Sequence, residues 1–406
     1  MFTPSHGAAS RRSCSVMDTG HDFEAEICRH DGAVIWTTKN ARCVRGADGQ
    51  VHYYEGTVED ITDRKRAREK NPPALLPHCS LPHSKKVLPM AHDEIKIGVS
   101  TCLLGEEVRF DAGHKRDRFV VDDLGRYVTF VAVCPEVGIG MSIPREAIRL
   151  VRHGEDIRLR GTRSDTDHTE AMLAYAEATV APLIEAGICG YVFKKGSPSC
   201  GLFRVKVYAE NGMPSHDGRG LYARVLADRL PDLPMEEEGR LFDPVLRDNF
   251  VTRLFAYRRL KTLFDGPWTL GDLVAFHSAE KMLLLAHHTQ TYEVLGRLVA
   301  KAKGRDRGEV AAEYRAAFLG GLAHHATPQR TTNVLQHMMG YFKDHLDADE
   351  KAELAGLIDD YHAELVPLVV PVTLLRHYVR KYGVTYLATQ TFLAPHPKEL
   401  MLRNHV

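Results

Sequence analysis

The sequence predicts an α/β domain with a mostly parallel sheet, followed by an all-α domain and preceded by a short antiparallel β segment. Three observations lead to this fold class. Hairpin signals mark the first 62 residues, continuous apolar runs follow from Ile95, and strand signals nearly vanish after Asp243. The expected organisation is a β segment (1–68), a proline-rich linker (69–93), the α/β domain (94–241) and the helical domain (242–406).

Composition excludes several classes of protein. The 406 residues carry 53 Lys plus Arg against 53 Asp plus Glu, so no overall basic field favours packaging of nucleic acid. Apolar runs such as Met282–Ala286 fall far below the roughly 20 residues of a membrane-spanning helix. The first 17 residues lack the apolar core of a secretory signal. We therefore expect a cytoplasmic protein without a membrane span.

The N-terminal segment predicts three antiparallel strands. Residues 22–62 alternate apolar and polar, and Asp31-Gly32 and Asp48-Gly49 are dipeptides that favour tight hairpin turns. The stretch from His30 to Ala67 resembles the C-terminal half of a PAS sensory domain. Only about half of that fold is present, so a working sensor pocket is not expected.

A proline-rich linker follows this segment. Pro72, Pro73, Pro77, Pro82 and Pro89 fall within 69–94, a composition that favours an extended connection. Met90 stands immediately before a strong strand, IKIGVS, which suggests that the functional protein starts there.

Continuous apolar runs predict buried parallel strands in the α/β domain. They cover Ile95–Ser100, Val128–Val133 and Gly190–Phe193, and a helical pattern covers Thr169–Ala186. After Asp243, apolar residues recur at helical spacing, as in LGDLVAFHSAEKMLLLAHH.

Three cysteines follow the predicted strands. Cys102 and Cys134 come at the ends of the first two strands, and Cys200 lies in the loop after the third. The carboxyl ends of parallel strands share one edge, where ligands of open α/β sheets bind, so these thiols can converge. Soft metals and iron-sulfur clusters select thiolates. Three ligands without an obvious fourth suggest an iron that the protein leaves open.

Polar residues flank these cysteines. Glu136 follows Cys134 closely and places a carboxylate beside the predicted metal site, where acid-base chemistry needs one. Ser197 and Ser199 lie in the loop that carries Cys200 and can direct hydroxyl groups into the same space.

Three motifs in this domain, TCLLGEEVRFDAGHK, VCPEVGIGMSIPREAIRLV and FKKGSPSCG, resemble the TudS-like thiouracil desulfidase family. The resemblance covers about residues 94–235 and implies a 4Fe-4S cluster with one iron not bound by protein. It implies Cys102, Cys134 and Cys200 as cluster ligands, Glu136 as the acid-base residue and Ser197 as a proton-transfer or positioning group. The implied reaction is a C-S hydrolysis that converts a thiolated nucleobase such as 2-thiouracil into uracil and hydrogen sulfide.

Other residues near these motifs are candidates for substrate binding. Arg109, Asp111 and Lys195 are expected to orient the base or the cluster, with surface ion pairs as the alternative for each. Ala112 departs from the pattern of the family that the motifs resemble, since Gly is expected at this position. The remaining cysteines, Cys14, Cys28, Cys43, Cys79 and Cys189, match no ligand motif, and Cys189 is expected in the core.

The helical domain resembles the C-terminal domain of YbgA-like proteins, through FHSAEKMLLLAHHTQTYEVLG and NVLQHMMGYFKDHL. His277 with Lys281, and Asn333 with His337, share helix faces and are candidates to line a pocket over the cluster, joined by His287 and Tyr292. A histidine metal site is a weaker alternative because no HExxH-like pairing is present. Basic residues here, including Arg253 and Arg380, lie among acids and indicate a mixed-charge surface.

Three other functions stay open. The first is an enzyme of tRNA thiolation or of thiolated RNA, with the helical domain as an RNA clamp. The second is a non-catalytic, stress-linked regulator, and the third is a structural zinc module. Salt-sensitive tRNA binding would indicate the RNA enzyme. An intact cluster without turnover would indicate the regulator, and a colourless protein would indicate the zinc module. The oligomeric state is not indicated by the sequence.

Overall fold

The computed structural model describes residues 19–28, 34–45, 51–60 and 95–405. The chain divides into two compact units, Met1–Leu88 and Pro89–Val406, each of which is described by itself. The predicted linker, the suggested start at Met90, and Cys14 and Cys79 lie outside the described residues. No helix in the described ranges is long and apolar enough to cross a membrane.

The first unit contains three antiparallel strands. They are β1 (Thr19–Cys28), β2 (Val34–Arg45) and β3 (Val51–Asp60), in the order β1-β2-β3. In the central strand, Thr38 pairs with Glu24 on one side and with Glu59 on the other. Three antiparallel strands are therefore present where hairpin signals predict them, and the PAS resemblance stays a prediction.

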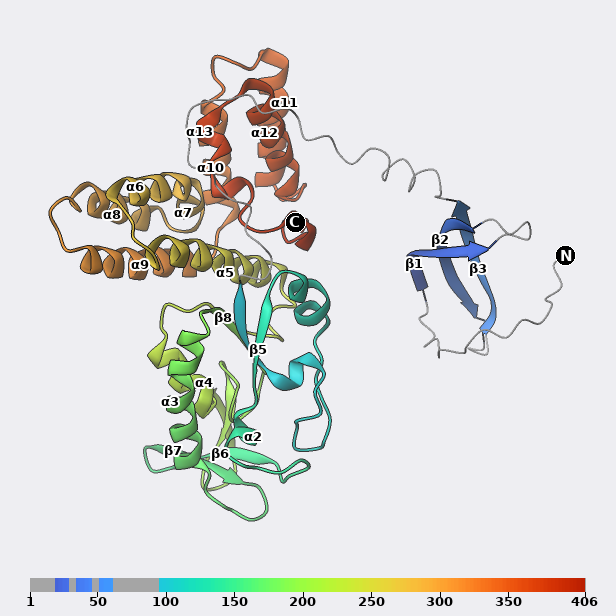
Figure 1. The fold of residues 1–406 in the computed structure, drawn as a ribbon, viewed down its shortest axis with the longest axis vertical. Coiled ribbons are helices and arrows are strands. Elements are labelled where there is room, and N and C mark those ends of the chain that lie inside the picture. Colours follow the sequence, from blue (N-terminus) through green and yellow to red (C-terminus); the bar gives the residue numbers. More distant parts are fainter. Residues whose placement is uncertain (1–18, 29–33, 46–50, 61–94, 406) are drawn as a thin grey trace. The chain divides into compact units, whose positions relative to one another are not determined.

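The second unit begins with a four-stranded parallel sheet in the order β11-β8-β4-β5 (Figure 1). Its strands are β4 (Lys96–Ser100), β5 (Thr129–Val133), β8 (Ile188–Phe193) and β11 (Met235–Glu237). All six residues of β8 are buried, as expected for a strand covered on both faces. The parallel sheet predicted from continuous apolar runs is confirmed.

The domain also contains a second, mixed sheet that the sequence did not predict. Its order is β10-β9-β6-β7, with antiparallel pairs at both ends and a parallel pair between β9 and β6. The strands are β6 (Ile148–His153), β7 (Asp156–Gly161), β9 (Val205–Tyr208) and β10 (Pro214–Gly218). Strands β6 and β7 are rich in Arg and half-exposed, so they lack the apolar runs of the first sheet.

Helices cover both faces of the parallel sheet. Helices α3 (Thr169–Glu185) and α4 (Leu221–Arg229) pack on the face that presents Tyr191. On the other face, α5 (Pro244–Phe264) packs its Leu254 against Ile97 and Val99. Between the strands lie α2 (Pro135–Gly138) and the short helices η2 (Thr101–Leu104), η3 (Phe119–Asp123) and η4 (Leu124–Arg126).

Two glycines allow this close packing. A Cβ atom on Gly98 would lie 2.1 Å from the ring of Tyr191, and one on Gly190 would lie 2.1 Å from Leu254. A side chain at either position would force the buried neighbour out of its place.

The all-helical prediction is confirmed for the described residues after Asp243. Helix α5 begins at Pro244, where the Asp243 side chain accepts hydrogen bonds from the first turn. The later elements are α6 (Leu270–Ala279), α7 (Lys281–His287), α8 (Thr289–Ala300), α9 (Arg307–Ala323), α10 (Pro328–Gly340), α11 (Ala348–His362), α12 (Val369–Tyr382), α13 (Thr385–Ala388), η5 (Thr391–Leu393) and η6 (Lys398–Leu400). Most of these helices share a second apolar core, whereas Phe250 and Leu254 of α5 and Leu400 of η6 pack in a core with Ile97 and Val99 of β4.

Candidate active site

The three predicted cysteine ligands line one cavity at the carboxyl edge of the parallel sheet. Cys102 lies in η2 directly after β4, Cys134 directly follows β5, and Cys200 lies in the loop after β8. The cavity measures about 290 Å³. Residues far apart in sequence thus meet because adjacent parallel strands end at the same edge.

The other predicted site residues divide between the cavity and its surroundings. Glu136, Ser197, Arg109 and Lys195 line the cavity together with the cysteines. Asp111 is absent from its lining and instead forms an ion pair with Arg109, with 3.5 Å between Oδ1 and Nε. Asp111 is therefore connected to the cavity only through its ion pair with Arg109 among the described residues.

Loop hydrogen bonds hold the cysteines in place. The backbone N–H of Cys200 donates to the Ser197 hydroxyl at 3.2 Å. The carbonyl of Cys102 accepts from the backbone N–H of Lys115 at 2.9 Å. The hydroxyl of Ser100 accepts from the backbone N–H of Lys194 at 3.0 Å, which joins the ends of β4 and β8.

Burial favours the neutral form of the three thiols. It raises the pKa of Cys102 to about 11, and it also raises the pKa of Cys134 and Cys200. Buried thiols release their protons when a cationic centre compensates the thiolate charge. Within residues 95–405, no three His, Cys, Asp or Glu side chains lie close enough to share one metal ion.

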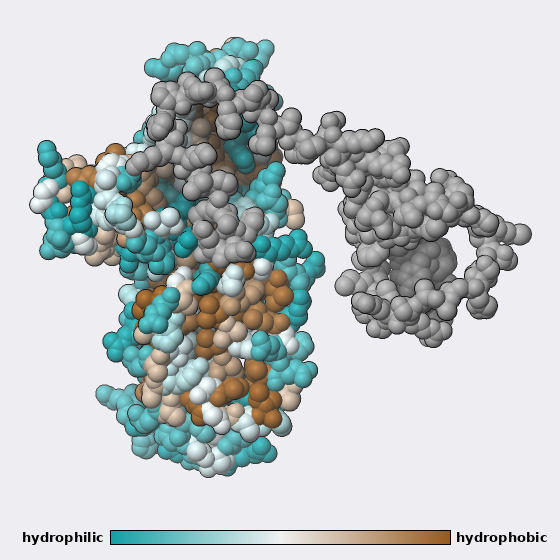
Figure 2. Space-filling model, viewed as in Figure 1, coloured by the Kyte–Doolittle hydropathy of each residue, from teal (hydrophilic) through white to brown (hydrophobic). Residues whose placement is uncertain are grey.

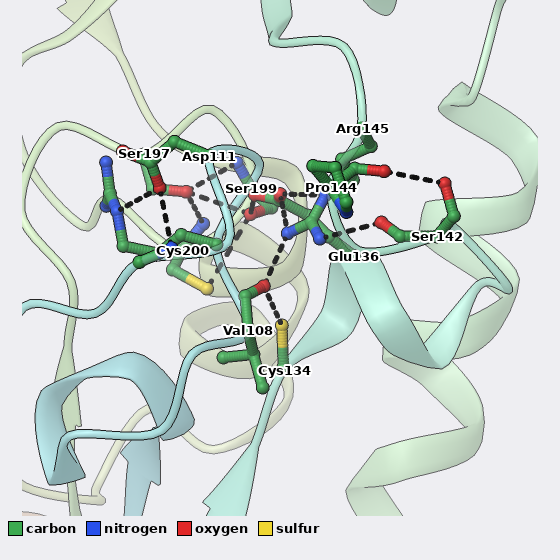
Figure 3. Close-up of polar contacts among 12 residues, drawn as sticks. Val108, Asp111, Cys134, Glu136, Ser142, Pro144, Arg145, Ser197, Ser199 and Cys200 are labelled. Atoms are coloured by element: carbon green, nitrogen blue, oxygen red, sulfur yellow. Dashed lines mark hydrogen bonds and ion pairs between the residues drawn. The ribbon is translucent and has the colours of Figure 1, made fainter.

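Glu136 is the carboxylate of the cavity, and two partners fix it (Figure 3). Arg145 donates to Oε2 from Nε at 3.0 Å and from a terminal nitrogen at 2.6 Å. Ser199 donates from Oγ to Oε1 at 2.7 Å. Only 4% of the Arg145 side chain and 15% of the Glu136 side chain are exposed, so this ion pair is largely shielded from water.

The two serines have different positions. Ser199 contacts Glu136 directly, whereas Ser197 lies 2.9 Å from the Ser199 hydroxyl and also accepts from the Cys200 backbone. Ser197, the predicted proton-transfer group, thus reaches the carboxylate through Ser199. A chain of hydroxyl groups connects Glu136 to the loop that carries Cys200.

Sequence reasoning missed Arg145. Besides Glu136, this side chain donates to the carbonyls of Val108 at 2.9 Å and Ser142 at 3.2 Å. The Cys134 thiol lies 3.9 Å from the same Val108 carbonyl, so Arg145 ties the acid and one cysteine to a common backbone segment. Arg145 lies in the quoted IPREAIRLV motif, which was its only sequence signal.

The cavity wall is basic and partly apolar. Its lining holds Arg109, Lys115, Arg145, Lys194 and Lys195 against the single acid Glu136. Lys194 pairs with Glu238 outside the cavity, whereas Lys115 and Lys195 form no ion pair within the described ranges.

Apolar side chains are exposed in the same domain. Phe110, which lines the cavity, is 39% exposed. Figure 2 shows apolar residues gathered across the middle of the viewed face of this domain.

The helical domain does not line this cavity, which corrects the expectation of a pocket over the cluster. All lining residues fall between Ser100 and Cys200. His277 instead stacks on Tyr292, with ring centres 5.1 Å apart, and Lys281 lies over the same ring. Asn333 and His337 are exposed, and His287 lines a different cavity. The first helix of this domain, α5, instead packs against a face of the sheet, where Leu254 shares a core with Ile97 and Val99.

Comparison with known proteins follows this division of the chain. Residues 97–238 match the family described as 2-thiouracil desulfurase, and residues 281–397 match a family described as a protein of unknown function, DUF1722. The protein described as uncharacterized protein YbgA, from Escherichia coli (strain K12), is 34% identical over 158 residues, which is 39% of this chain and 94% of YbgA. The chain belongs to the YbgA family.

This member of the YbgA family carries a 2-thiouracil desulfurase domain before its YbgA-like domain. A solved structure described as a 4Fe-4S-dependent thiouracil desulfidase, TudS, is 31% identical. The match covers 36% of this chain and 93% of TudS, with a TM-score of 0.29. The predicted combination of a thiouracil desulfidase domain and a YbgA-like domain is confirmed.

Proposed function

We propose that the α/β domain is a desulfidase that removes sulfur from a thiolated nucleobase such as 2-thiouracil, giving uracil and hydrogen sulfide. The observation that carries this proposal is the meeting of three thiols, two of them buried and that of Cys134 half-buried, with one fixed carboxylate in a single cavity. The match of residues 97–238 to the 2-thiouracil desulfurase family supports the reaction class.

The residues present fit a 4Fe-4S cluster held by Cys102, Cys134 and Cys200. Three soft donors come from separate loops around one cavity, and they do not gather within reach of a single ion. Burial raises the pKa of Cys102, while the nearby charges of Arg109 and Lys194 favour its thiolate, which supports the proposed ligand role. When bound, a cluster with one iron not held by protein supplies a Lewis acid for the substrate sulfur.

Glu136 is the proposed acid-base residue. Hydrolysis consumes one water, forms a C–O bond at the thiocarbonyl carbon, breaks the C–S bond and releases hydrogen sulfide. One oxygen of Glu136 accepts the water proton, while Arg145 and Ser199 hold the carboxylate in place. The Ser199–Ser197 pair provides a route by which that proton reaches the departing sulfur.

Substrate binding falls to the cavity wall. Phe110 offers a partly exposed aromatic face to a planar base, and Arg109 lies over the Phe110 ring with 5.3 Å to its centre. Arg109 and Lys195 donate to the carbonyl oxygen of the base, and Asp111 orients Arg109.

The first test measures iron, acid-labile sulfide and zinc per chain after anaerobic purification. We expect near four iron and four sulfide in the wild type, and loss of both on changing Cys102, Cys134 or Cys200 to Ser. Cys189→Ala is a matched control, because Cys189 is fully buried in the same sheet but does not line the cavity. Zinc in place of iron, or full iron in all three Ser variants, would contradict the proposal.

The second test measures sulfide release from 2-thiouracil. Glu136→Gln keeps the size and shape of the side chain and removes its basicity, so we expect a loss of about 10²–10⁴-fold with iron content unchanged. Retention of full activity would remove Glu136 from the mechanism.

A second candidate substrate is a thiolated RNA such as tRNA, favoured by Lys115 and Lys195 at the cavity, for which the described part of the chain supplies no ion-pair partner. Contacts with phosphate groups make the affinity depend on salt concentration. Between 50 and 200 mM salt, the affinity for tRNA should fall by about 10-fold for every two phosphates that the protein contacts. Activity on the free base that does not depend on salt, together with the absence of tRNA binding, would leave the free nucleobase as the substrate.

A further inference from the structure

A second cavity lies within the helical domain, and the desulfidase proposal does not use it. It measures about 240 Å³ and is bounded by α5, α7, the start of α10, the end of α11 and the C-terminal segment. At about 30 Å³ per water, its volume equals that of about eight water molecules. It therefore suits a ligand of roughly ten non-hydrogen atoms.

Arg403 brings an incompletely paired cation to this cavity. One terminal nitrogen donates to the Phe392 carbonyl at 2.6 Å, and the guanidinium lies 4.9 Å from the centre of the Phe392 ring. Its Nε is buried and has no hydrogen-bond partner among residues 95–405. A buried donor without a partner indicates that an acceptor is missing, because desolvation of such a group is costly.

Asp248 brings a carboxylate to the same cavity. His396 contacts its Oδ1 at 2.9 Å, and Thr252 donates to that same oxygen at 3.4 Å. No hydrogen bond joins Oδ2 to another residue in the described part of the chain, and 23% of the side chain is exposed. Asp248 thus keeps one oxygen available for a donor.

The rest of the lining is neutral or apolar, apart from Glu364 and the terminal His405. Burial lowers the pKa of His287 to about 4, so this ring is neutral at physiological pH, and its Nδ1 is paired with the His324 carbonyl at 2.7 Å. Aliphatic and aromatic walls include Leu283, Leu368 and Phe392. The cavity therefore offers the cation of Arg403, the carboxylate of Asp248, the exposed carboxylate of Glu364 and an apolar surface.

These groups discriminate among ligand classes. A purely apolar ligand would desolvate Arg403 and Asp248 without compensation. A phosphate dianion would place two further negative charges beside Asp248 and Glu364. A ligand with an anionic and a cationic group on one apolar body compensates both side chains and leaves the net charge unchanged.

We propose that this cavity binds a free α-amino acid with an apolar side chain. The ligand carboxylate accepts from Arg403, the ammonium group donates to Asp248, and the side chain packs on Leu283, Leu368 and Phe392. L-Leucine, with nine non-hydrogen atoms, is a probe of suitable size.

The test is calorimetric titration of the full-length protein with L-leucine, L-methionine and L-phenylalanine. We expect saturable binding of at least one of them to one site per chain. Two analogues of leucine separate the charges, since leucinamide lacks the carboxylate and 4-methylpentanoate lacks the ammonium group. Each should bind about tenfold more weakly or worse, because each leaves one buried charged group without its partner.

Variants locate the site. Arg403→Gln should abolish binding, but it also removes the bond to Phe392 and can disturb the fold. A second variant, Ala326→Phe, fills the cavity and leaves Arg403 and Asp248 in place, so it should also remove binding. Arg380→Gln, at an exposed position on α12, is the control and should bind as the wild type does.

Several results would overturn the proposal. They are the absence of binding by all three amino acids, equal binding of 4-methylpentanoate or inorganic phosphate, and unchanged binding by the Ala326→Phe variant. None of these measurements depends on the cluster or on sulfide release, so this proposal and the desulfidase proposal fail independently.

Discussion

Replacing Arg145 by Met tests whether this arginine holds Glu136 in place. The change removes two hydrogen bonds to the Glu136 carboxylate and one each to the carbonyls of Val108 and Ser142. It also leaves a carboxylate with only 15% exposure next to an apolar side chain.

The expected cost follows from the burial of this pair. Breaking a buried ion pair by removing one partner costs about 3–5 kcal/mol, and the partial exposure of Glu136 places this pair near the lower end, at about 3 kcal/mol. At about 2–4 °C per kcal/mol, the midpoint of thermal unfolding should fall by about 6–12 °C. Arg145→Lys keeps the charge but loses the forked geometry, so we expect an intermediate loss.

A double-mutant cycle gives the decisive assay. Glu136→Gln removes the charge that Arg145 compensates, so the double variant should be more stable than the sum of the single losses by about 1 kcal/mol or more. Thermal unfolding of the four proteins, followed by circular dichroism, measures this difference. Losses that add within about 0.5 kcal/mol would refute the argument that Arg145 acts through Glu136.

Four further predictions follow from other parts of the second unit. Gly98→Ala should lower stability by about 1–3 kcal/mol in urea unfolding, because the new methyl group meets the Tyr191 ring at 2.1 Å. Ala112 has φ +54°, so Ala112→Gly should raise the thermal midpoint by relieving backbone strain of about 1 kcal/mol. Burial lowers the pKa of His287 to about 4 in the folded protein, so as the pH falls this histidine becomes protonated in the unfolded chain before it does in the folded one. The free energy of unfolding should therefore fall by about 2–3 kcal/mol between pH 6.5 and pH 4. In unfolding measured against pH, His287→Asn should make this dependence weaker. A fragment of residues 95–241 should bind a dye for exposed apolar surface and aggregate, because it lacks the helix that covers one sheet face.

The parallel sheet was predictable from sequence because burial on both faces leaves a direct signal. The runs Ile95–Ser100 and Val128–Val133 lie within one residue of the observed β4 and β5. The second sheet left no such signal, since β6 and β7 carry arginines on half-exposed positions. Continuous apolar runs indicate that a strand is buried on both faces. A half-exposed hairpin such as β6–β7 can be predicted only from a turn motif between its strands, and the single Gly154, at φ +59°, was too weak a signal.

The candidate site was partly predictable for a similar reason. The geometry of parallel strands brings their carboxyl ends together, so the placement of Cys102, Cys134 and Cys200 around one cavity follows from strand order. Arg145 was missed because its contact with Glu136 depends on the path of an irregular loop. The roles of all these residues in binding and catalysis stay predictions.

The position of α5 explains why the helical domain leaves the cavity open. Phe250, Val251 and Leu254 of this helix share a core with Ile97 and Val99 of β4, so the helix lies against a face of the sheet. The carboxyl edge is left to the loops after β4, β5 and β8 and to the adjoining start of β6, where Ile148 lines the cavity. In Figure 1, the helices after α5 lie at the far end of this unit from α2 and β6. All residues that line the cavity therefore belong to the α/β domain. Besides α5, Leu400 and Leu402 of the C-terminal segment share the core of Ile97 and Val99, so an influence of the helical domain on the cavity can pass through either contact.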